Sequence, residues 1–229
     1  MKIGLVLFPN LTQLDLTGPY EVFVRVPDAE VFLVAAQFEP VRSDRGLSIL
    51  PNTTFADCPA LDILCVPDGP GVLNAMIDQN MISFLQKQGA TAHYVTSVCT
   101  GALVLAAAGL LDGYKATTHW LSIDLLKLFD KVEVINERVV KDRNRLTGGG
   151  VTAGIDFGLA LVAEIYGEAA AQTIQLSIEY CPQPPFNAGS PSTAPALVLE
   201  AVLTKTAEAQ AIRKQKILNL LKQSAHTQS

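Results

Sequence analysis

Short, continuous apolar runs alternate with helical patterns along the first half of the chain, and this alternation constrains the fold most strongly. Strands that are apolar along their whole length are typical of a parallel sheet that is covered on both faces. The sequence therefore predicts an α/β fold, with a mostly parallel sheet between two layers of helices. The strand-like runs span residues 2–8, 30–36, 61–71 and 92–98, and the third of these ranges includes the Gly-Pro-rich turn at its end.

Helical patterns fill most of the intervening chain. The Gly18-Pro19 pair predicts a break with a helix after it. A second break is expected near Gly167, inside the longest helical pattern. The longest helical pattern covers residues 152–180, and the others cover residues 74–89, 101–111 and 116–129.

A segment rich in Pro, Gly and Ser precedes the last helical pattern. It spans residues 181–195 and is expected to be irregular. The helix after it is expected to carry Arg213 on a solvated face. Because a lone terminal helix cannot build its own core, we expect one domain over residues 1–229. Its C-terminal helical extension, at about 194–224, is expected to pack on the body or on a second subunit.

Composition and charge exclude several classes of function. The 229 residues are 49% hydrophobic and 17% charged, which is ample material for one large core. The net charge of −5 argues against nucleic acid as a partner, since that needs a basic face. The sequence shows neither a signal-peptide pattern nor a membrane-length apolar run, so we expect a cytoplasmic protein without a membrane partner. The spacing of its cysteines and histidines predicts neither a disulfide framework nor a metal site.

Cys99 stands at the junction between the strand at 92–98 and the helix at 101–111. Parallel-sheet enzymes place their chemistry at the carboxyl ends of strands, so this side chain is expected to face a cleft. The free N–H groups at a helix N-terminus favour a thiolate, and we expect them to lower the pKa of Cys99. Gly101 permits a close approach in this tight turn, as in the nucleophile elbow of hydrolases. The competing interpretation is a small buried hydrophobic residue.

Asp15 lies just beyond the carboxyl end of the first strand, where its loop can approach the Cys99 loop. An acid flanked by Leu14 and Leu16 is poorly solvated, which raises its pKa and suits it to hold a proton. A helix cap or turn residue is an equally open interpretation. At the exit of the third strand, the N–H groups of Gly69 and Gly71 are expected to point at the same cleft.

Five motifs follow one another over roughly residues 2–195. They read LDLTGP, SVCTGALVLAAAGLLDG, ATTHW, LTGGGVTAGIDF and PPFNAGSP. Together they resemble the ThiJ/PfpI superfamily, and within it the members that hydrate isocyanides (isonitriles). The resemblance implies a flavodoxin-like α/β sandwich, a homodimer, no cofactor and no metal. It also implies an enzyme that hydrates isocyanides to N-substituted formamides through a covalent thioimidate.

The same resemblance assigns roles to individual residues. Cys99 is the nucleophile and Asp15 is the acidic partner at its sulfur. The backbone N–H groups of Thr100 and Gly69 form an oxyanion-type pocket. The resemblance implies further residues near the bound substrate, namely Asp68, His119, Gly150 and Val151.

One position departs from the family motif, whose Pro-Gly-Gly turn reads Pro67-Asp68-Gly69 here. The replaced glycine is a candidate for an unusual φ, which aspartate tolerates better than most residues. A carboxylate at Asp68 is expected to repel the thiolate and raise its pKa, unless it turns to solvent. Thr100, and no histidine, follows Cys99, which disfavours a Cys-His-acid triad.

Three other functions stay open. Some members of the superfamily perform glyoxalase or deglycase chemistry, but those usually carry glutamate where this chain has Asp15. A redox or ligand sensor would use oxidation of Cys99 instead of turnover. The glycines at 148–153 match a dinucleotide fingerprint loosely, without the acid that should follow it.

Overall fold

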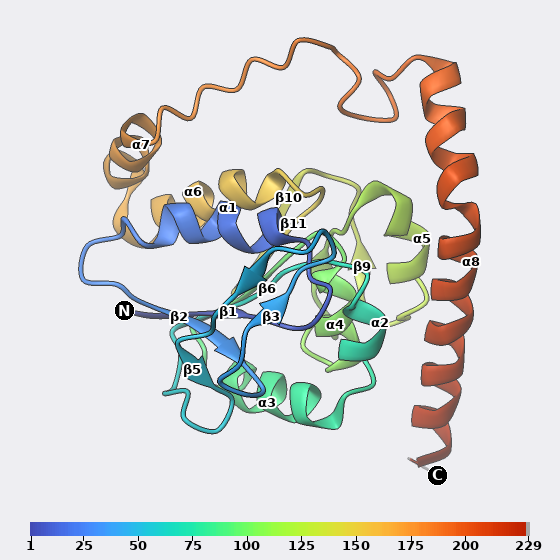
Figure 1. Ribbon diagram of the computed structural model, residues 1–229, viewed down its shortest axis with the longest axis horizontal. Helices are drawn as coiled ribbons and strands as arrows, with labels where there is room; N and C mark the ends of the chain where they lie inside the picture. The colour runs from blue at the N-terminus through green and yellow to red at the C-terminus, as the bar shows by residue number, and fades with distance from the viewer. Residues whose placement is uncertain (228–229) are drawn as a thin grey trace.

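The computed structural model describes residues 1–227, and residues 224–227 by their backbone alone. Its centre is a seven-stranded sheet (Figure 1). The strands are β1 (Lys2–Val6), β2 (Glu30–Ala35), β5 (Thr53–Thr54), β6 (Ile63–Val66), β7 (Tyr94–Val98), β10 (Val139–Asp142) and β11 (Arg145–Gly148). They lie in the order β10-β11-β7-β6-β1-β2-β5, and only the β10–β11 pair is antiparallel. Two short two-stranded pairs, β3 (Val41–Arg42) with β4 (Ser48–Ile49) and β8 (Lys115–Ala116) with β9 (Glu133–Val134), flank this sheet.

Helices cover both faces of the sheet, which confirms the predicted architecture. They are α1 (Gln13–Phe23), α2 (Val72–Ala75), α3 (Gln79–Gly89), α4 (Gly101–Ala107), the 3₁₀ helix η1 (Trp120–Ser122), α5 (Ile123–Leu126), α6 (Ala153–Tyr166), α7 (Glu168–Ser177) and α8 (Ala196–Thr227). Helices α1 and α6 lie on one face, and α3 and α4 lie on the other (Figure 1). Among the residues that the structure describes, no helix combines the length and the apolar content that crossing a membrane requires.

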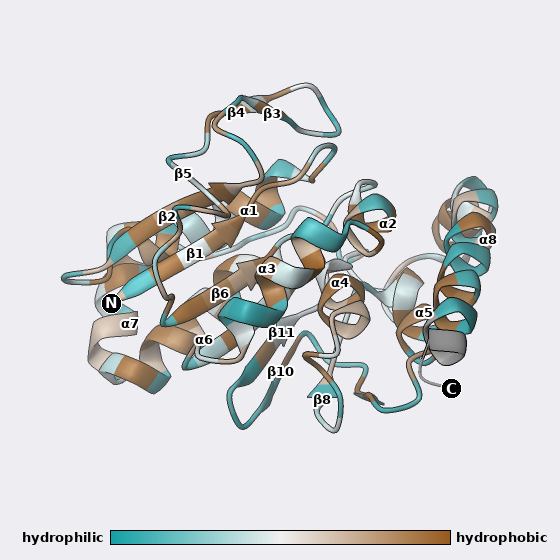
Figure 2. Ribbon diagram, turned by 90° about the horizontal axis from the view of Figure 1, so that it is seen from below, coloured by the Kyte–Doolittle hydropathy of each residue, from teal (hydrophilic) through white to brown (hydrophobic). Residues whose placement is uncertain are grey.

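The continuous apolar runs correspond to the central strands, as expected. All four residues of β6 are buried, and so are four of the five in β7. Figure 2 shows these strands as largely hydrophobic between helices of mixed character. Phe23 of α1 and Phe157 of α6 meet edge to face, with ring centroids 6.0 Å apart. Burial on both faces explains why the strand pattern lacks alternation.

The predicted break at Gly18-Pro19 is wrong, because α1 begins at Gln13 and runs through both residues. A proline inside a helix removes the hydrogen bond to the carbonyl four residues earlier, here that of Asp15, and its ring crowds that carbonyl. Pro19 also packs against Gly154 of α6, where an added Cβ would lie 2.8 Å from the proline Cδ. This packing against α6 holds the helix together across the proline. The expected break at Gly167 is confirmed, since this residue has φ 85° and separates α6 from α7.

The prediction of a helix over residues 116–129 is wrong for most of that segment. The segment contains the end of β8, then η1 and the single turn of α5. Thr117 and Thr118 lie between them with buried side chains, and their hydroxyl groups bond outside any helix. The Thr118 hydroxyl therefore makes a tertiary contact, and neither threonine starts a long helix.

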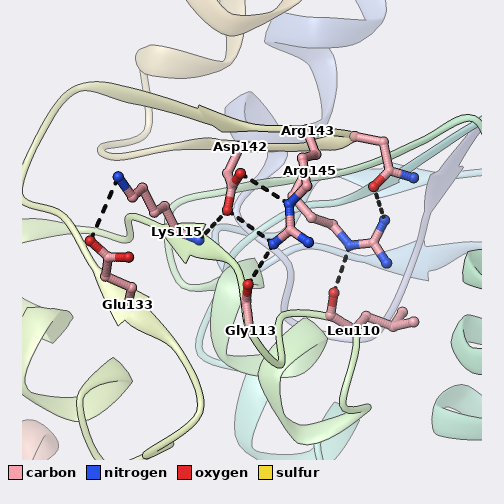
Figure 3. Close-up of polar contacts among 8 residues, drawn as sticks. Leu110, Gly113, Lys115, Glu133, Asp142, Arg143 and Arg145 are labelled. Atoms are coloured by element: carbon pink, nitrogen blue, oxygen red, sulfur yellow. Dashed lines mark hydrogen bonds and ion pairs between the residues drawn. The ribbon is translucent and has the colours of Figure 1, made fainter.

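A polar network fixes the β10–β11 hairpin against the loop that follows α4 (Figure 3). Arg145 Nε donates to the Leu110 carbonyl at 2.6 Å, and the backbone N–H of Lys115 donates to Asp142 at 2.9 Å. Arg143 stacks on the Tyr114 ring, 3.8 Å from its centroid. These contacts hold β11 in place beside β7, and so they position the glycines that follow β11.

Helix α8 stands at one side of the body, and an extended segment connects it to α7 (Figure 1). It lies against α2 and α5. Its Ile217 is fully buried in the same hydrophobic core as the central strands. Arg213, one turn earlier, is half-buried on the same side of the helix. The expectation that Arg213 lies on a solvated face is therefore wrong.

Candidate active site

Cys99 lies between the last residue of β7 and the first turn of α4, in a left-handed conformation with φ 54°. Its N–H donates to the Gly148 carbonyl at 2.8 Å, and its carbonyl accepts from the Thr118 hydroxyl at 2.8 Å. A left-handed φ is uncommon outside glycine and persists only where surrounding contacts enforce it. The turn therefore has the strained geometry of a nucleophile elbow, as the sequence indicated.

Gly101 allows this turn to form. A Cβ at this position would lie 2.2 Å from the Val66 carbonyl oxygen at the end of β6. The first turn of α4 therefore approaches the neighbouring strand more closely than any other residue would allow. This contact places Cys99 next to the turn that leaves β6.

The turn at 67–71 carries Asp68 toward the cysteine. Its backbone is fixed by the N–H of Thr12, which donates to the Asp68 carbonyl at 2.7 Å. Gly69 has φ 150°, and a Cβ there would lie 2.2 Å from the Asn10 carbonyl oxygen. The unusual φ that we expected at Asp68 therefore belongs to Gly69, and Asp68 has no positive φ.

Both oxygens of the Asp68 carboxyl group contact the nucleophile turn. The Cys99 thiol donates to Asp68 Oδ2, with Sγ and oxygen 2.7 Å apart. The hydroxyl of Thr100 donates to Asp68 Oδ1. Asp68 is only 9% exposed, so the alternative in which its carboxylate turns to solvent is excluded.

Asp15 completes the cluster from the first turn of α1. It is fully buried, and neither of its carboxyl oxygens has a hydrogen-bond partner among the described residues. One ligand atom each of Asp15, Asp68 and Cys99 lies within 4.8 Å of the other two. The loop after the first strand thus meets the Cys99 loop, as the topology predicted.

Burial determines the protonation of this cluster. Burial, followed by the charge of Asp68, raises the pKa of Asp15 from 3.8 to about 9. Burial also raises the pKa of Asp68, although hydrogen bonds from Cys99 and from the Gly69 N–H oppose this effect. Asp15 therefore holds a proton at neutral pH.

The pKa of Cys99 is raised well above its ordinary value, which contradicts the expected lowering. Burial is the largest cause, and the charges of Asp68 and Asp15 add to it. A hydrogen bond from the Thr100 N–H favours the thiolate but does not outweigh these effects. The sulfur is therefore a thiol at rest, and its proton lies against Asp68.

A cavity of about 520 Å³ adjoins the support of the nucleophile turn, although Asp15, Asp68 and Cys99 are not among the residues that line it. Its wall includes Thr118, whose hydroxyl binds the Cys99 carbonyl. Three of the predicted substrate contacts, His119, Gly150 and Val151, line the cavity. Burial lowers the pKa of His119, so its ring is neutral at neutral pH. The irregular segment also contributes the residues from Gly189 to Ser192 to the lining.

Sequence reasoning missed two residues near the site. Thr118 supports the nucleophile turn through the Cys99 carbonyl. Arg213 of α8 is close enough for its positive charge to lower the pKa of both Asp68 and His119. The sequence signal for Arg213 is its spacing from Ile217, since residues four apart share one face of a helix.

The fold and the nucleophile turn together define a family. The DJ-1/PfpI family model matches residues 1–164, and the chain belongs to this family. The chain is 51% identical over 213 residues to an isonitrile hydratase from Pseudomonas putida, and the match covers 93% of each chain. The resemblance to the ThiJ/PfpI superfamily that the motifs predicted is confirmed.

A solved structure and a regulator extend the comparison. A ThiJ/PfpI family protein from Pseudomonas syringae superimposes with a TM-score of 0.91 at 46% identity, covering 94% of this chain and 90% of that chain. The flavodoxin-like fold is thereby confirmed. The HTH-type transcriptional regulator GbdR from Pseudomonas aeruginosa is 30% identical over 180 residues, which cover 76% of this chain and 49% of the regulator.

Proposed function

We propose that this protein hydrates isonitriles to N-substituted formamides, with Cys99 as the nucleophile and Asp15 as the acid. The observation that carries the proposal is the pairing of a thiol with a carboxyl group that holds its proton at neutral pH, because its pKa is raised to about 9. The 51% identity to an isonitrile hydratase supports the substrate class.

The first step forms a thioimidate. The sulfur of Cys99 attacks the terminal carbon of R–N≡C and gives up its proton, while Asp15 delivers a proton to the same carbon. The N–H of Thr100 faces the sulfur and stabilises negative charge there. The product of this step is R–N=CH–S–Cys99, and Asp15 is left as a carboxylate.

The second step releases the formamide. The Asp15 carboxylate takes a proton from water as the hydroxyl attacks the thioimidate carbon, and the nitrogen takes up the proton that Cys99 lost. Collapse of this adduct breaks the C–S bond and returns the hydroxyl proton to sulfur. The carboxyl group of Asp15 thus acts first as an acid and then as a base. At the end of the cycle, Asp15 and Cys99 both carry their proton again.

The site disfavours a redox sensor. A redox sensor requires a thiolate at rest, whereas the raised pKa of Cys99 keeps its sulfur a thiol. A glyoxalase would convert methylglyoxal, and this substrate serves as the competing arm of the assay.

The test follows an aromatic isonitrile by absorbance and identifies the product by mass spectrometry. We expect the wild-type protein to form the N-aryl formamide, Cys99→Ala to be inactive, and Asp15→Asn to lose about 10²–10⁴-fold in kcat. Cys181→Ser is the matched control, because Cys181 is exposed and far from the cluster in sequence. Conversion of methylglyoxal without conversion of the isonitrile would contradict the proposal.

We also propose that the chain forms one domain and acts as a cytoplasmic homodimer. The burial of Ile217 in the common core supports the single domain. Helix α8 leaves apolar side chains exposed, among them Leu197 at 81% and Ile212 at 49%, which supports a second copy as their cover. All four cysteines are free, as is usual in a reducing compartment. Light scattering after size exclusion tests the dimer.

A further inference from the structure

Asp68 occupies the turn position that the family motif fills with glycine, and its carboxyl group lies beside the nucleophile. Three donors face this carboxyl group: the Cys99 thiol, the Thr100 hydroxyl and the Gly69 N–H. The Gly69 N–H, expected to serve an oxyanion-type pocket, is therefore directed at Asp68. The proton of the thiol points at Asp68 and not at Asp15.

We propose that Asp68 is a catalytic base of this protein, which removes the proton from Cys99 as the sulfur attacks its substrate. The proposal deepens the proposed function and rests on it for the identity of the substrate. It divides the work between two carboxyl groups, with Asp68 as the base and Asp15 as the acid.

The surroundings of the two carboxyl groups decide which one carries the negative charge. Two carboxylates this close cannot both ionise at neutral pH, so one of them keeps a proton. Asp15 is fully buried, and its own backbone N–H is the one donor near its carboxyl group among the described residues, whereas Asp68 has three donors. The charged and titratable groups that face Asp68 are Cys99, Asp15, His119 and Arg213, and the positive charge of Arg213 favours its carboxylate. The proton therefore stays on Asp15 and the charge on Asp68.

The side chains of Asp15, Asp68 and Cys99 also have ligand atoms of the kind that bind zinc. The distance between Cys99 and Asp68, however, favours a shared proton. Zinc lies about 2.3 Å from sulfur and about 2.0–2.2 Å from oxygen, and a tetrahedral angle then separates these ligand atoms by roughly 3.5 Å. Cys99 Sγ and Asp68 Oδ2 are 2.7 Å apart, which is a hydrogen-bond distance. The contact is thus that of a donor with its acceptor.

The proton balance of the reaction closes with these two residues. The thiol proton moves from sulfur to Asp68 while the C–S bond forms and Asp15 protonates the terminal carbon. When water attacks, Asp15 recovers a proton from water and Asp68 passes its own to the nitrogen. On collapse, the hydroxyl proton returns to sulfur through Asp68, and the cluster is as it began.

The first arm of the test measures proton transfer without any isonitrile. Cys181→Ser serves as the parent, because it removes the exposed thiol. Iodoacetamide alkylation of Cys99 is followed by peptide mass spectrometry across pH, in the parent and with Asp68→Asn or Asp112→Asn added. Asp112 is the matched control, a partly exposed carboxylate paired with Lys131.

In the parent and in the Asp112→Asn control, we expect the alkylation rate to rise in a step as Asp68 ionises. Asp68→Asn should lose this step, because an amide accepts a hydrogen bond but not the proton. Its alkylation rate should rise only at alkaline pH, where the thiol itself ionises. An Asp68→Asn profile that keeps the acid step would overturn the proposal. Thermal melting confirms that each variant is folded.

The second arm measures isonitrile turnover near neutral pH. We expect kcat to fall at least about 10²-fold in Asp68→Asn, the lower end of what a general base contributes. A variant as fast as the parent, or faster, would show that Asp68 only repels the thiolate, and the proposal would be wrong. If the parent itself converts no isonitrile, the proposed function fails, while the alkylation arm still decides the role of Asp68.

Discussion

The backbone N–H of Thr12 donates to the carbonyl of Asp68 at 2.7 Å, and this bond joins two loops that come from different strands. The first loop leads into α1, whose first turn carries Asp15. The second leaves β6 and carries Asp68 toward Cys99. The cluster of two acids and one thiol therefore depends on backbone packing between these loops.

Gly69→Ala should disrupt this packing. The new Cβ would collide with the Asn10 carbonyl oxygen at 2.2 Å, in a backbone conformation with φ 150°. Strain of this kind costs about 1–3 kcal/mol, and the collision adds to it. We expect a clearly lower Tm by circular dichroism. Gly189→Ala is the control, because a Cβ there meets open space; equal Tm values for the two variants would contradict this account of the turn.

Thr118→Val should weaken the nucleophile turn without touching the sulfur. It removes the donor to the Cys99 carbonyl, a bond of 2.8 Å, and leaves that carbonyl with the longer 3.5 Å bond from the Ala102 N–H, at a cost of about 0.5–1.5 kcal/mol. We expect a lower free energy of unfolding in urea and a lower kcat. Thr118→Ser keeps the hydroxyl and should restore both values; a serine variant as impaired as the valine variant would argue that the methyl group matters instead.

Asp15→Asn should stabilise the protein in a way that depends on pH. The pKa of Asp15 is 3.8 unfolded and about 9 folded, so between these values the unfolded chain has lost a proton that the folded protein retains. The folded wild type therefore loses stability as pH rises through this window, whereas a neutral amide does not. The Tm difference between variant and wild type should grow from about pH 5 to about pH 8. A difference that is constant across this range would show that Asp15 is not held protonated.

Arg213→Gln should move the acid limb of the activity profile. A base must be deprotonated, so activity is lost as pH falls through the pKa of Asp68. Arg213 lowers that pKa, and its removal should therefore shift the acid limb of kcat/KM to higher pH. Lys214→Gln, one residue further on and exposed, should leave the profile unchanged. Identical shifts in both variants would indicate a general effect of charge.

The strands and the nucleophile turn could be predicted because their signals are local. An apolar run followed by Cys99 and Gly101 predicts both the end of a buried strand and the tight turn after it. The helix across Pro19 could not be predicted, because its packing against Gly154 involves a residue far along the chain. The raised pKa of Cys99 could not be predicted for a similar reason. A helix N-terminus favours a thiolate, but burial and two acids from other loops outweigh it.

Arg213 shows the same limit. Lys214 and Lys216, which follow it closely, are charged and exposed, so the local pattern indicates a solvated face. Only the burial of Ile217 and the contacts of α8 with α2 and α5 turn this side of the helix toward the body.

The covalent intermediate on Cys99 tests the central claim most directly. Rapid acid quenching of the wild-type protein with an aromatic isonitrile, followed by intact mass and peptide mapping, should reveal an adduct on Cys99. Its added mass should equal that of the whole isonitrile, because a thioimidate keeps every atom of the substrate and of the thiol. Formamide production by Cys99→Ala, or an adduct on another residue during turnover, would contradict the account.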